Sequence, residues 1–491
     1  MAADLAFREV TIVDGTGAPG TPGDVAVTNG RISHVGPTGS AGDATVDVDG
    51  RGHVLAPGFV DVHTHDDGAL LRHPDLGFKV SQGCTSLVIG NCGFSAAPAE
   101  PGRRDPSGLI GVEPTWTGLE GFRTAVAEAR PAANAVALVG HNTIRSLVMG
   151  NERRDPTDAE LDRMRAMVRD AMADGACGFS TGLIYEPGRY SRTDEAIALA
   201  TESAAAGGLY ATHMRNEGDR LLEAVDEAIH IGRTAGLPVQ ISHHKAAGRR
   251  NWGKVAESLA RVDEAVADGM DVTLDVYPYT AGSGPMAQYF DLDRLDPELA
   301  EVIRIASCPA FPAYEGRMAV DIAADEGIAV TDVVRRILTA PEGDRTICIQ
   351  FIIDEPDVET NLRHPSMMVG SDGIPDLRGR PHPRLFGTFP RVLGHYVRDR
   401  AVIGLEEAVR RMTSLSCDRF GLVDRGRVGE GQWADLVLFD PATVADAATY
   451  DEPKTPSVGV RVVAVAGEIV LEDGRDTGAR PGALLRYRDG G

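Results

Sequence analysis

The chain has 491 residues, with 43% hydrophobic and 25% charged side chains, which is typical of a globular protein with room for one large and one smaller domain. Its formal net charge of −23 repels nucleic acid and anionic membrane surfaces, so we expect neither as a partner. The sequence has no apolar stretch of about 18 residues and no secretory signal pattern at its start, so we expect no membrane span and a cytoplasmic location.

The first part of the chain, residues 1 to 56, predicts a small β structure. Short strand-like runs alternate there with Gly, Pro and Asp, which is typical of strands joined by turns. The runs are Leu5–Arg8, Asp24–Thr28, Ile32–Val35 and Ala44–Asp47.

The central part of the chain, residues 57 to 424, alternates apolar strand-like runs with helical patterns. Four of the helical patterns are Asp158–Ala173, Asp194–Ala206, Asp219–Ala235 and Lys254–Ala267. Strands that alternate with helices in this way predict a (β/α)8 barrel of the TIM type. The strand-like runs are Gly58–His65, Thr85–Cys92, Ala135–His141, Cys177–Leu183, Leu209–Arg215, Val239–His244, Val272–Tyr279 and Met367–Asp372.

Two further segments complete the predicted organisation. The segment between Thr280 and Met367 is too long for one crossover, so we expect an inserted helical lid near residues 282–345 and a strand at Thr346–Ile353. In residues 425–491 the strand pattern returns. We expect this segment to join residues 1–56 in one small β-sandwich beside the barrel. The returning strands are Ala434–Asp440, Val460–Ala466 and Glu468–Glu472.

Polar residues that suit a metal ion stand at the ends of several predicted barrel strands. His63 and His65 lie two residues apart at the end of the first strand, so their side chains should point to the same place. Cysteine, histidine and aspartate follow the later strands, at the barrel rim where catalytic groups gather. Each alone has an ordinary structural explanation, but together they predict a Zn²⁺ site. These later residues are Cys92, His213, His243, His244 and Asp372.

The six cysteines are sparse and show no pattern, so we expect free thiols, one of them a metal ligand, rather than disulfides. They are Cys84, Cys92, Cys177, Cys308, Cys348 and Cys417.

Over nearly its whole length the sequence resembles the amidohydrolase superfamily, and more narrowly the D-aminoacylases, or N-acyl-D-amino-acid deacylases. The stretch from Pro57 to Asp67, which contains His63-Thr-His65, marks the superfamily. Most hydrolytic amidohydrolases carry a carboxylated lysine on strand 4, whereas the matching run here is Gly178-Phe-Ser-Thr-Gly182. The D-aminoacylases instead have a cysteine at the end of strand 2, as Cys92 is here. Narrower motifs are Gly90-Asn-Cys-Gly-Phe94, Ser180-Thr-Gly-Leu-Ile-Tyr-Glu-Pro187, Ile241-Ser-His-His-Lys245 and Pro381-His-Pro-Arg384.

The resemblance implies a role for each candidate residue. Cys92, His213 and His243 would hold one tight zinc, and His63 and His65 would form a second, often weakly filled, site that shares the Cys92 thiolate. His244 is the weaker alternative to His243, because adjacent strand residues face opposite ways. Asp372 would act as general base and acid, and Tyr185 would donate a hydrogen bond to the oxyanion. Substrate-binding residues would be Arg384, which grips the carboxylate, assisted by Lys245 and by Tyr277 or Tyr279.

The resemblance leaves several alternatives open. His141 and Asn142 either line the pocket or pack structurally, and Asp66 and Asp67 either support the metal ligands or form turns. The activity is expected to be hydrolysis of an N-acyl-D-amino acid, with a weak preference for apolar side chains. N-acyl-D-glutamate or N-acyl-D-aspartate deacylase, dipeptidase, cyclic amidase, deaminase and a non-catalytic scaffold are the alternatives. The protein is expected to be a monomer or a homodimer.

Overall fold

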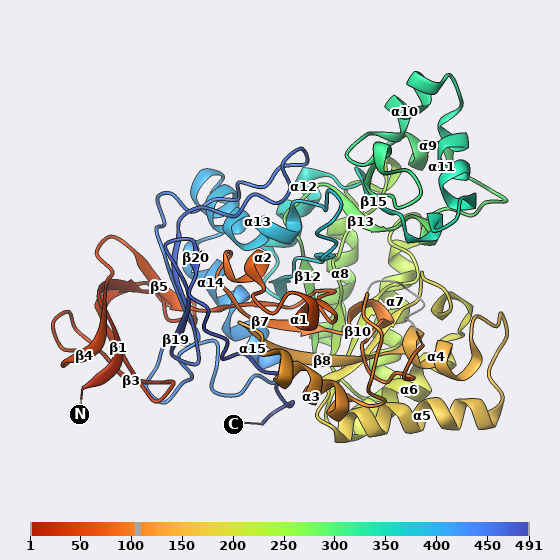
Figure 1. Cartoon of the computed structure of the whole chain (residues 1–491). Helices are drawn as coiled ribbons and strands as arrows, with labels where there is room; N and C mark the ends of the chain where they lie inside the picture. The colour runs from red at the N-terminus through yellow and green to blue at the C-terminus, as the bar shows by residue number, and fades with distance from the viewer. Residues whose placement is uncertain (1, 104–109, 490–491) are drawn as a thin grey trace.

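The computed structural model describes residues 2–103 and 110–489 and has a parallel β barrel at its centre (Figure 1). Eight strands lie side by side in chain order, and neighbouring strands run parallel. Two backbone hydrogen bonds, from Asp372 N to His63 O and from His65 N to Gly373 O, bring the segments after the first and last strands together. The barrel strands are β6 (Phe59–Asp61), β7 (Cys84–Ile89), β8 (Asn134–Gly140), β9 (Gly178–Gly182), β10 (Leu209–His213), β11 (Val239–Ile241), β12 (Val272–Val276) and β16 (Met367–Val369).

The predicted (β/α)8 fold is therefore confirmed, and the strands are shorter than the apolar runs that predict them. Val60, Val88, Val136 and Leu209 belong to one buried apolar cluster that includes residues of five barrel strands. A larger cluster joins the strands to the surrounding helices. His213 is the last residue of β10, whereas the other candidate ligands follow the ends of their strands.

Helices surround the barrel, and two of the four predicted helices have the predicted bounds. These two are α5 (Asp158–Ala173) and α8 (Lys254–Ala267). Thr157 begins α5 with a capping box, because its side chain accepts from Glu160 N while Glu160 accepts from Thr157 N. The others are α1 (Ala69–Arg72), α2 (Gly77–Val80), α3 (Leu119–Ala129), α4 (His141–Met149), α6 (Thr193–Ala205), α7 (Leu221–Ala235), α12 (Glu355–Arg363), α13 (Arg384–Arg391), α14 (Leu405–Met412) and α15 (Ser414–Phe420).

The two ends of the chain meet in one nine-stranded sheet beside the barrel (Figure 1). The junction is the antiparallel pair β5–β17, in which Leu55 lies opposite Leu438. The inner apolar side chains of both ends form one cluster, which includes Phe7, Val25 and Leu436. The strands are β1 (Ala3–Ile12), β2 (Thr21–Thr28), β3 (Arg31–Gly36), β4 (Ala44–Asp49), β5 (Val54–Pro57), β17 (Leu436–Phe439), β18 (Val460–Val465), β19 (Glu468–Glu472) and β20 (Arg475–Asp476).

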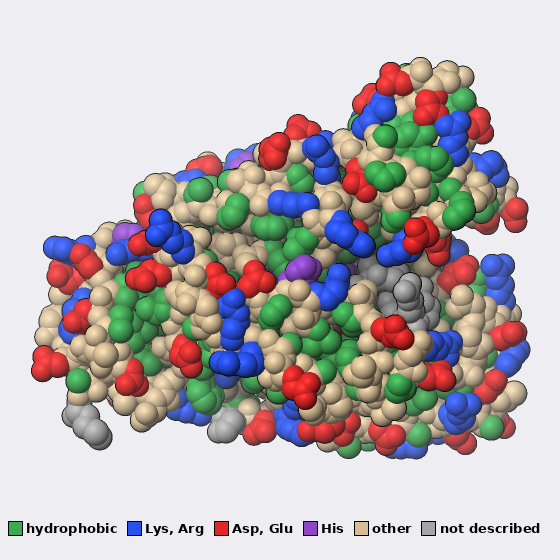
Figure 2. Space-filling model, viewed as in Figure 1, with side chains coloured by type: hydrophobic (Ala, Val, Ile, Leu, Met, Phe, Trp, Pro, Cys, Tyr) green, Lys and Arg blue, Asp and Glu red, His purple; other side chains and the backbone are tan. Residues whose placement is uncertain are grey.

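The long segment between β12 and β16 forms a projection with its own apolar cluster (Figures 1 and 2). It holds helices, as expected, but also a three-stranded antiparallel sheet of which the sequence predicts one strand. Its elements are β13 (Gly282–Pro285), η4 (Met286–Gln288), α9 (Pro297–Glu301), β14 (Ile303–Ser307), α10 (Ala319–Glu326), α11 (Val330–Thr339) and β15 (Ile347–Gln350). Across the described residues, no helix is both long and apolar enough to cross a membrane.

Candidate metal centre

A cluster of buried histidines surrounds Cys92 at the carboxyl ends of the barrel strands. Cys92 follows β7, and its Sγ lies 3.3 Å from His63 Nε2, 3.7 Å from His213 Nδ1 and 3.5 Å from His243 Nε2. All four residues are buried. Burial alone would raise the pKa of the Cys92 thiol, but His63 and His243 hold it well below its usual range. The sulfur is therefore a thiolate, the form that binds metals.

These distances fit a zinc ion. Tetrahedral zinc with bonds of about 2.3 Å to sulfur and 2.0–2.1 Å to nitrogen places the sulfur about 3.5 Å from each nitrogen. The three nitrogens lie within 0.2 Å of that separation. His63, Cys92 and His243 form one group whose ligand atoms all lie within 4.8 Å of one another. The chemistry of the donors, one thiolate and several imidazoles, suits Zn²⁺.

A second group of ligand atoms adjoins the first. His63, His65 and Asp372 are all buried, and Asp372 Oδ1 lies 3.1 Å from His65 Nε2 and 3.6 Å from His63 Nε2. Burial opposes the charge on His65, but its hydrogen bond to Asp372 raises the pKa of His65 to about 9. His63 thus belongs to both groups, and the cluster could hold two neighbouring ions.

Three residues of the cluster have left-handed backbone conformations. The φ angles are 55° at Cys92, 35° at His243 and 50° at Asp372. This region is uncommon for residues other than glycine, and such strain persists only where the surroundings fix it. The backbone is thus bent after three different strands, and each bend carries a cluster residue.

Two carboxylates that the sequence analysis missed support the histidines from behind. Glu217 Oε1 lies 2.9 Å from His243 Nδ1, and Glu217 Oε2 lies 3.5 Å from His213 Nε2. Asp275 Oδ1 accepts a hydrogen bond from His243 N at 2.7 Å and lies 3.3 Å from His63 Nδ1. Carboxylates behind metal-binding imidazoles fix the ring orientation and the tautomer. Glu217 follows His213 by four residues, and this spacing is the signal that could have found it.

Lys245 and His244 follow His243 but lie in different surroundings. Lys245 Nζ donates to Glu217 Oε1 at 2.5 Å and lies 2.9 Å from His243 Nδ1, so it belongs to the cluster. His244 contacts Asn361 and Ser258 instead, at 2.7 and 2.6 Å, outside the cluster. The two adjacent histidines therefore have separate environments, as predicted, although both follow β11 rather than lie on it.

Arg384 is buried beside Asp372. Its Nη2 lies 3.0 Å from Asp372 Oδ2, and its guanidinium stacks over the Tyr277 ring at 4.4 Å. Burial would raise the pKa of Asp372, but Arg384 holds it well below its usual range. Among the described residues, Nε and Nη1 of Arg384 and the hydroxyl of Tyr277 have no hydrogen-bond partner. Buried donors without partners call for a ligand, and here they would suit an anion.

The two remaining aromatic candidates differ in position. The Tyr185 ring lies 4.5 Å from the His213 ring, and its hydroxyl contacts the hydroxyl of Tyr289 at 3.2 Å. Tyr279 instead donates to Asp446 at 3.3 Å and packs under Arg391 at 4.8 Å. Of the alternatives Tyr277 and Tyr279, Tyr277 is the one that packs against Arg384.

The four polar residues whose roles the sequence left undecided form hydrogen bonds or ion pairs with other parts of the fold. His141 Nε2 lies 2.8 Å from Glu195 Oε1 and joins α4 to α6, and Asn142 donates to Gly182 O and joins α4 to β9. Asp67 accepts from Gly90 N and Ala96 N, on either side of Cys92, and thus holds the Cys92 loop. Asp66 lies 3.3 Å from Lys79 Nζ.

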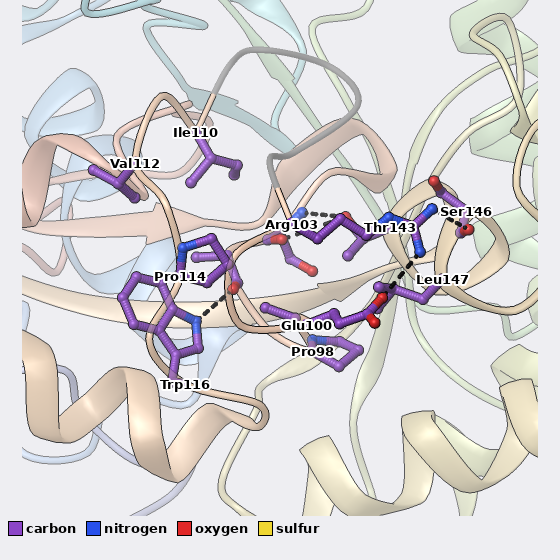
Figure 3. A pocket seen from close by; sticks show the side chains of 13 residues that line it. Pro98, Glu100, Arg103, Ile110, Val112, Pro114, Trp116, Thr143, Ser146 and Leu147 are labelled. Carbon is purple, nitrogen blue, oxygen red and sulfur yellow. Dashed lines mark hydrogen bonds and ion pairs between the residues drawn. The ribbon is translucent and has the colours of Figure 1, made fainter.

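Two cavities adjoin Asp372 or its loop. The first is bounded by His65, Asp372, Tyr185 and uncharged residues, namely Phe94, Ser283, Gly284, Pro285, Gln288 and Ile374. The second shares Ser283 and Ile374 with it and also includes Asp376 and His382. A separate cavity lies between helix α4 and described residues of the segments 95–103 and 110–116 (Figure 3). Its walls are mainly apolar, and its two charged residues, Glu100 and Arg103, pair with each other at 3.3 Å, so it offers no comparable chemistry.

Comparisons with known proteins identify the family. The model of the amidohydrolase family matches residues 47–314 and 300–471. D-aminoacylase of Alcaligenes xylosoxydans xylosoxydans is 43% identical over 98% of this chain and 97% of its own length. N-acyl-D-aspartate deacylase of the same organism is 42% identical over 99% and 96%.

A solved structure gives the same result in three dimensions. N-acyl-D-glutamate deacylase from Bordetella bronchiseptica, in complex with zinc and a phosphonate inhibitor that mimics the tetrahedral intermediate, superposes with a TM-score of 0.91. It is 41% identical and covers 99% of this chain and 100% of its own. The chain therefore belongs to the amidohydrolase family, in the group formed by D-aminoacylase and the N-acyl-D-amino-acid deacylases.

Proposed function

We propose that this protein is a zinc-dependent N-acyl-D-amino-acid deacylase, which hydrolyses the amide bond to release a D-amino acid and a carboxylate. The observation that carries the proposal is the Cys92 thiolate among three imidazoles, next to a buried carboxylate and a buried arginine with free donors. Relatives that cover the whole chain are D-amino-acid deacylases, which supports the same reaction here.

Cys92, His213 and His243 would hold the tight zinc. His213 and His243 are both braced by Glu217, which makes them the more rigid pair of imidazoles. His63 and His65 would complete the second, weaker site together with the Cys92 thiolate. When bound, zinc polarises the amide carbonyl and lowers the pKa of water. The chain's own residues supply the remaining steps.

Asp372 is the proposed general base and acid. Its carboxylate is ionised at neutral pH because Arg384 holds its pKa low, and it lies 3.1 Å from His65. It can accept a proton from the attacking water and return it to the nitrogen of the leaving amine. Among the described members of the two ligand groups that contain His63, Asp372 is the sole carboxylate.

Tyr185 is the proposed donor to the oxygen that becomes negative in the tetrahedral intermediate. Its ring touches that of His213, so the hydroxyl stands on the wall of the cavity next to the metal ligands. Burial keeps the pKa of Tyr185 well above its usual range, so the hydroxyl retains its proton and can donate.

Arg384 is the proposed clamp for the free carboxylate of the substrate. Two of its donors have no partner in the described part of the chain, and a guanidinium binds a carboxylate with two parallel hydrogen bonds. The Tyr277 ring packs against the face of the guanidinium, and its hydroxyl, which has no partner among the described residues, could also donate to the substrate carboxylate. Lys245, 5.7 Å above the same ring, adds positive charge on this side.

The clamp and the metal together account for the handedness of the proposed substrate. The carboxylate at Arg384 and the carbonyl at the metal fix two substituents of the α-carbon, and the side-chain pocket fixes the third. A single enantiomer then places all three correctly. The relatives favour the D form.

A neutral, apolar D-side chain fits the surroundings best. Apart from His65 and Asp372 themselves, the first cavity beside Asp372 has uncharged walls, including Phe94 and Ile374. The second adds Asp376, whose carboxylate would repel an acidic side chain. No lysine or arginine is among the described lining residues of these two cavities. We therefore place D-leucine and D-methionine derivatives ahead of those of D-glutamate and D-aspartate.

Two alternatives receive less support. Cyclic amidases with the bridging lysine would need it on β9, where this chain has Gly178-Phe-Ser-Thr-Gly182. A non-catalytic scaffold would be expected to have lost part of the site, yet every candidate ligand is present and buried.

The proposal is tested with the purified protein and a panel of substrates. We expect release of amino acid from N-acetyl-D-leucine and N-acetyl-D-methionine, weaker release from N-acetyl-D-glutamate and N-acetyl-D-aspartate, and little from the L-isomers or from hydantoins. The activity should disappear on treatment with a chelator and return with Zn²⁺. Hydrolysis of hydantoin but not of the linear amides would overturn the proposal.

A further inference from the structure

The first and last strands of the barrel, β6 and β16, meet with little backbone pairing. Every other neighbouring pair in the barrel sheet forms a ladder of several residues. Between these two strands the described chain has one isolated bridge, Thr64 with Gly373. This seam runs between the segments that carry His63, His65 and Asp372, so its rigidity decides how the proposed base faces the metal ligands.

A buried side-chain network spans the same seam. Lys79, on helix α2, is fully buried, and its Nζ donates to Asp61 Oδ2 at 2.6 Å and to Ser371 Oγ at 2.7 Å. Asp61 Oδ1 accepts from Ser371 N at 2.8 Å. Ser371 Oγ in turn accepts from Gly373 N at 3.0 Å. Strand β6, helix α2 and the loop after β16 are therefore joined at one ammonium group.

The network holds the two neighbours of Asp372 on either side. Ser371 is bound through its amide and its hydroxyl, and Gly373 is bound through its amide. Asp372 between them has a φ of 50°, a conformation that a residue with a side chain keeps only when its surroundings impose it. The hydrogen bond from Asp372 N to His63 O, at 2.7 Å, completes the constraint.

We infer that Lys79 and Ser371 are positioning residues, which act through Asp372 by fixing its strained backbone at the barrel seam. The inference rests on the proposed function only in the role it gives to Asp372. Among the described residues, neither side chain hydrogen-bonds to a ligand atom of the metal cluster. The effect therefore passes through the backbone, at residues 371–373 and at His63 O, which lies 3.5 Å from Ser371 Oγ.

Ser371→Ala is the principal test, because it removes the hydroxyl but leaves the Lys79–Asp61 ion pair in place. We expect kcat to fall about 10- to 100-fold, since a misplacement of about 1 Å can cost a hundredfold. KM and the zinc content should stay within a factor of two. Ser371→Thr keeps the oxygen and should recover most of the rate. Ser416→Ala is the matched control, because Ser416 is equally buried but bonds Arg411 O away from the site.

A double-variant cycle separates positioning from a general loss of structure. If Ser371 acts through Asp372, then Ser371→Ala should cause no further loss of kcat in an Asp372→Asn background. Equal fold losses in the two backgrounds would overturn the inference, as would a wild-type rate in Ser371→Ala itself.

Crystal structures provide a readout that does not depend on the substrate. In Ser371→Ala we expect the Asp372 carboxylate to shift away from His65, while the histidines around Cys92 stay in place. An unchanged Asp372 would overturn the inference. If the wild-type protein hydrolyses no N-acyl-D-amino acid, the proposed function fails, and this structural comparison still decides whether the network positions Asp372.

Discussion

Replacing Arg384 by alanine is the most informative test of substrate recognition. Arg384 pairs with Asp372 at 3.0 Å, and two of its buried donors have no partner among the described residues. A substrate carboxylate that takes up these donors would form a buried, charge-assisted pair. The variant should therefore bind the substrate carboxylate poorly. Among the described residues, Lys245 is the one other cation that lies over the Tyr277 ring, so little positive charge would remain at this place.

The size of the effect follows from the burial of the pair. Truncating one partner of a buried, hydrogen-bonded charge pair costs about 2–5 kcal/mol. At about 1.4 kcal/mol for each factor of ten, KM should rise about 30- to 3,000-fold. The same change leaves Asp372 buried without its partner, which lowers the stability of the fold by up to about 3–5 kcal/mol. The assay must separate these two effects.

The ratio of two rates, measured on one protein preparation, separates the loss of carboxylate binding from the loss of folded protein. The rates on N-acetyl-D-leucine and on its neutral amide are compared, so that any loss of folded protein cancels. Wild type should prefer the free acid strongly, and Arg384→Ala should narrow this preference to near one. Arg384→Lys keeps the charge but loses the two-pronged geometry, so it should fall between. A preference that is unchanged in Arg384→Ala would refute the clamp.

Three other substitutions test the metal centre and proton transfer. Glu217→Gln should weaken zinc binding about 10- to 100-fold, because the carboxylate contacts two of the proposed zinc ligands. Competition with a chelator measures the zinc affinity, and an unchanged affinity would show that Glu217 does not support the ligands. Asp372→Asn should keep the zinc but lower kcat by about 10²–10⁴, and near-normal turnover in steady-state assays would reject it as the base. Cys92→Ala should lose the tight zinc in elemental analysis, whereas a full equivalent of bound metal would contradict its place as a ligand.

The arrangement of the barrel was predictable because it depends on local patterns that repeat. Alternating apolar runs and helical patterns fixed the strand order, and Thr157 with Glu160 marks the start of α5 in the sequence itself. The inserted segment was less predictable. Strand β13 is Gly-Ser-Gly-Pro, which has no strand pattern, and it pairs with β15 through contacts distant in the sequence.

Some residues of the candidate site were likewise predictable from the sequence, and others were not. Residues at the ends of the apolar runs, such as His63 and Cys92, could be named from their positions, because the barrel brings the carboxyl ends of all its strands to one rim. The sequence does not predict the roles of Glu217 and Asp275 as clearly, because their contacts with the histidines depend on side-chain geometry. The resemblance left Tyr277 and Tyr279 as alternatives, and the side-chain contacts separate them, because Tyr277 packs against Arg384 whereas Tyr279 contacts Asp446.

The central claim is that zinc held by Cys92 and the histidines serves hydrolysis of one enantiomer of an N-acyl amino acid. It is tested most directly by measuring bound metal and the rates on N-acetyl-D-leucine and N-acetyl-L-leucine in the same preparation. We predict about one tightly bound zinc per chain and turnover of the D-isomer, with little turnover of the L-isomer. Equal rates on the two isomers, or full activity in protein that contains no transition metal, would contradict the account.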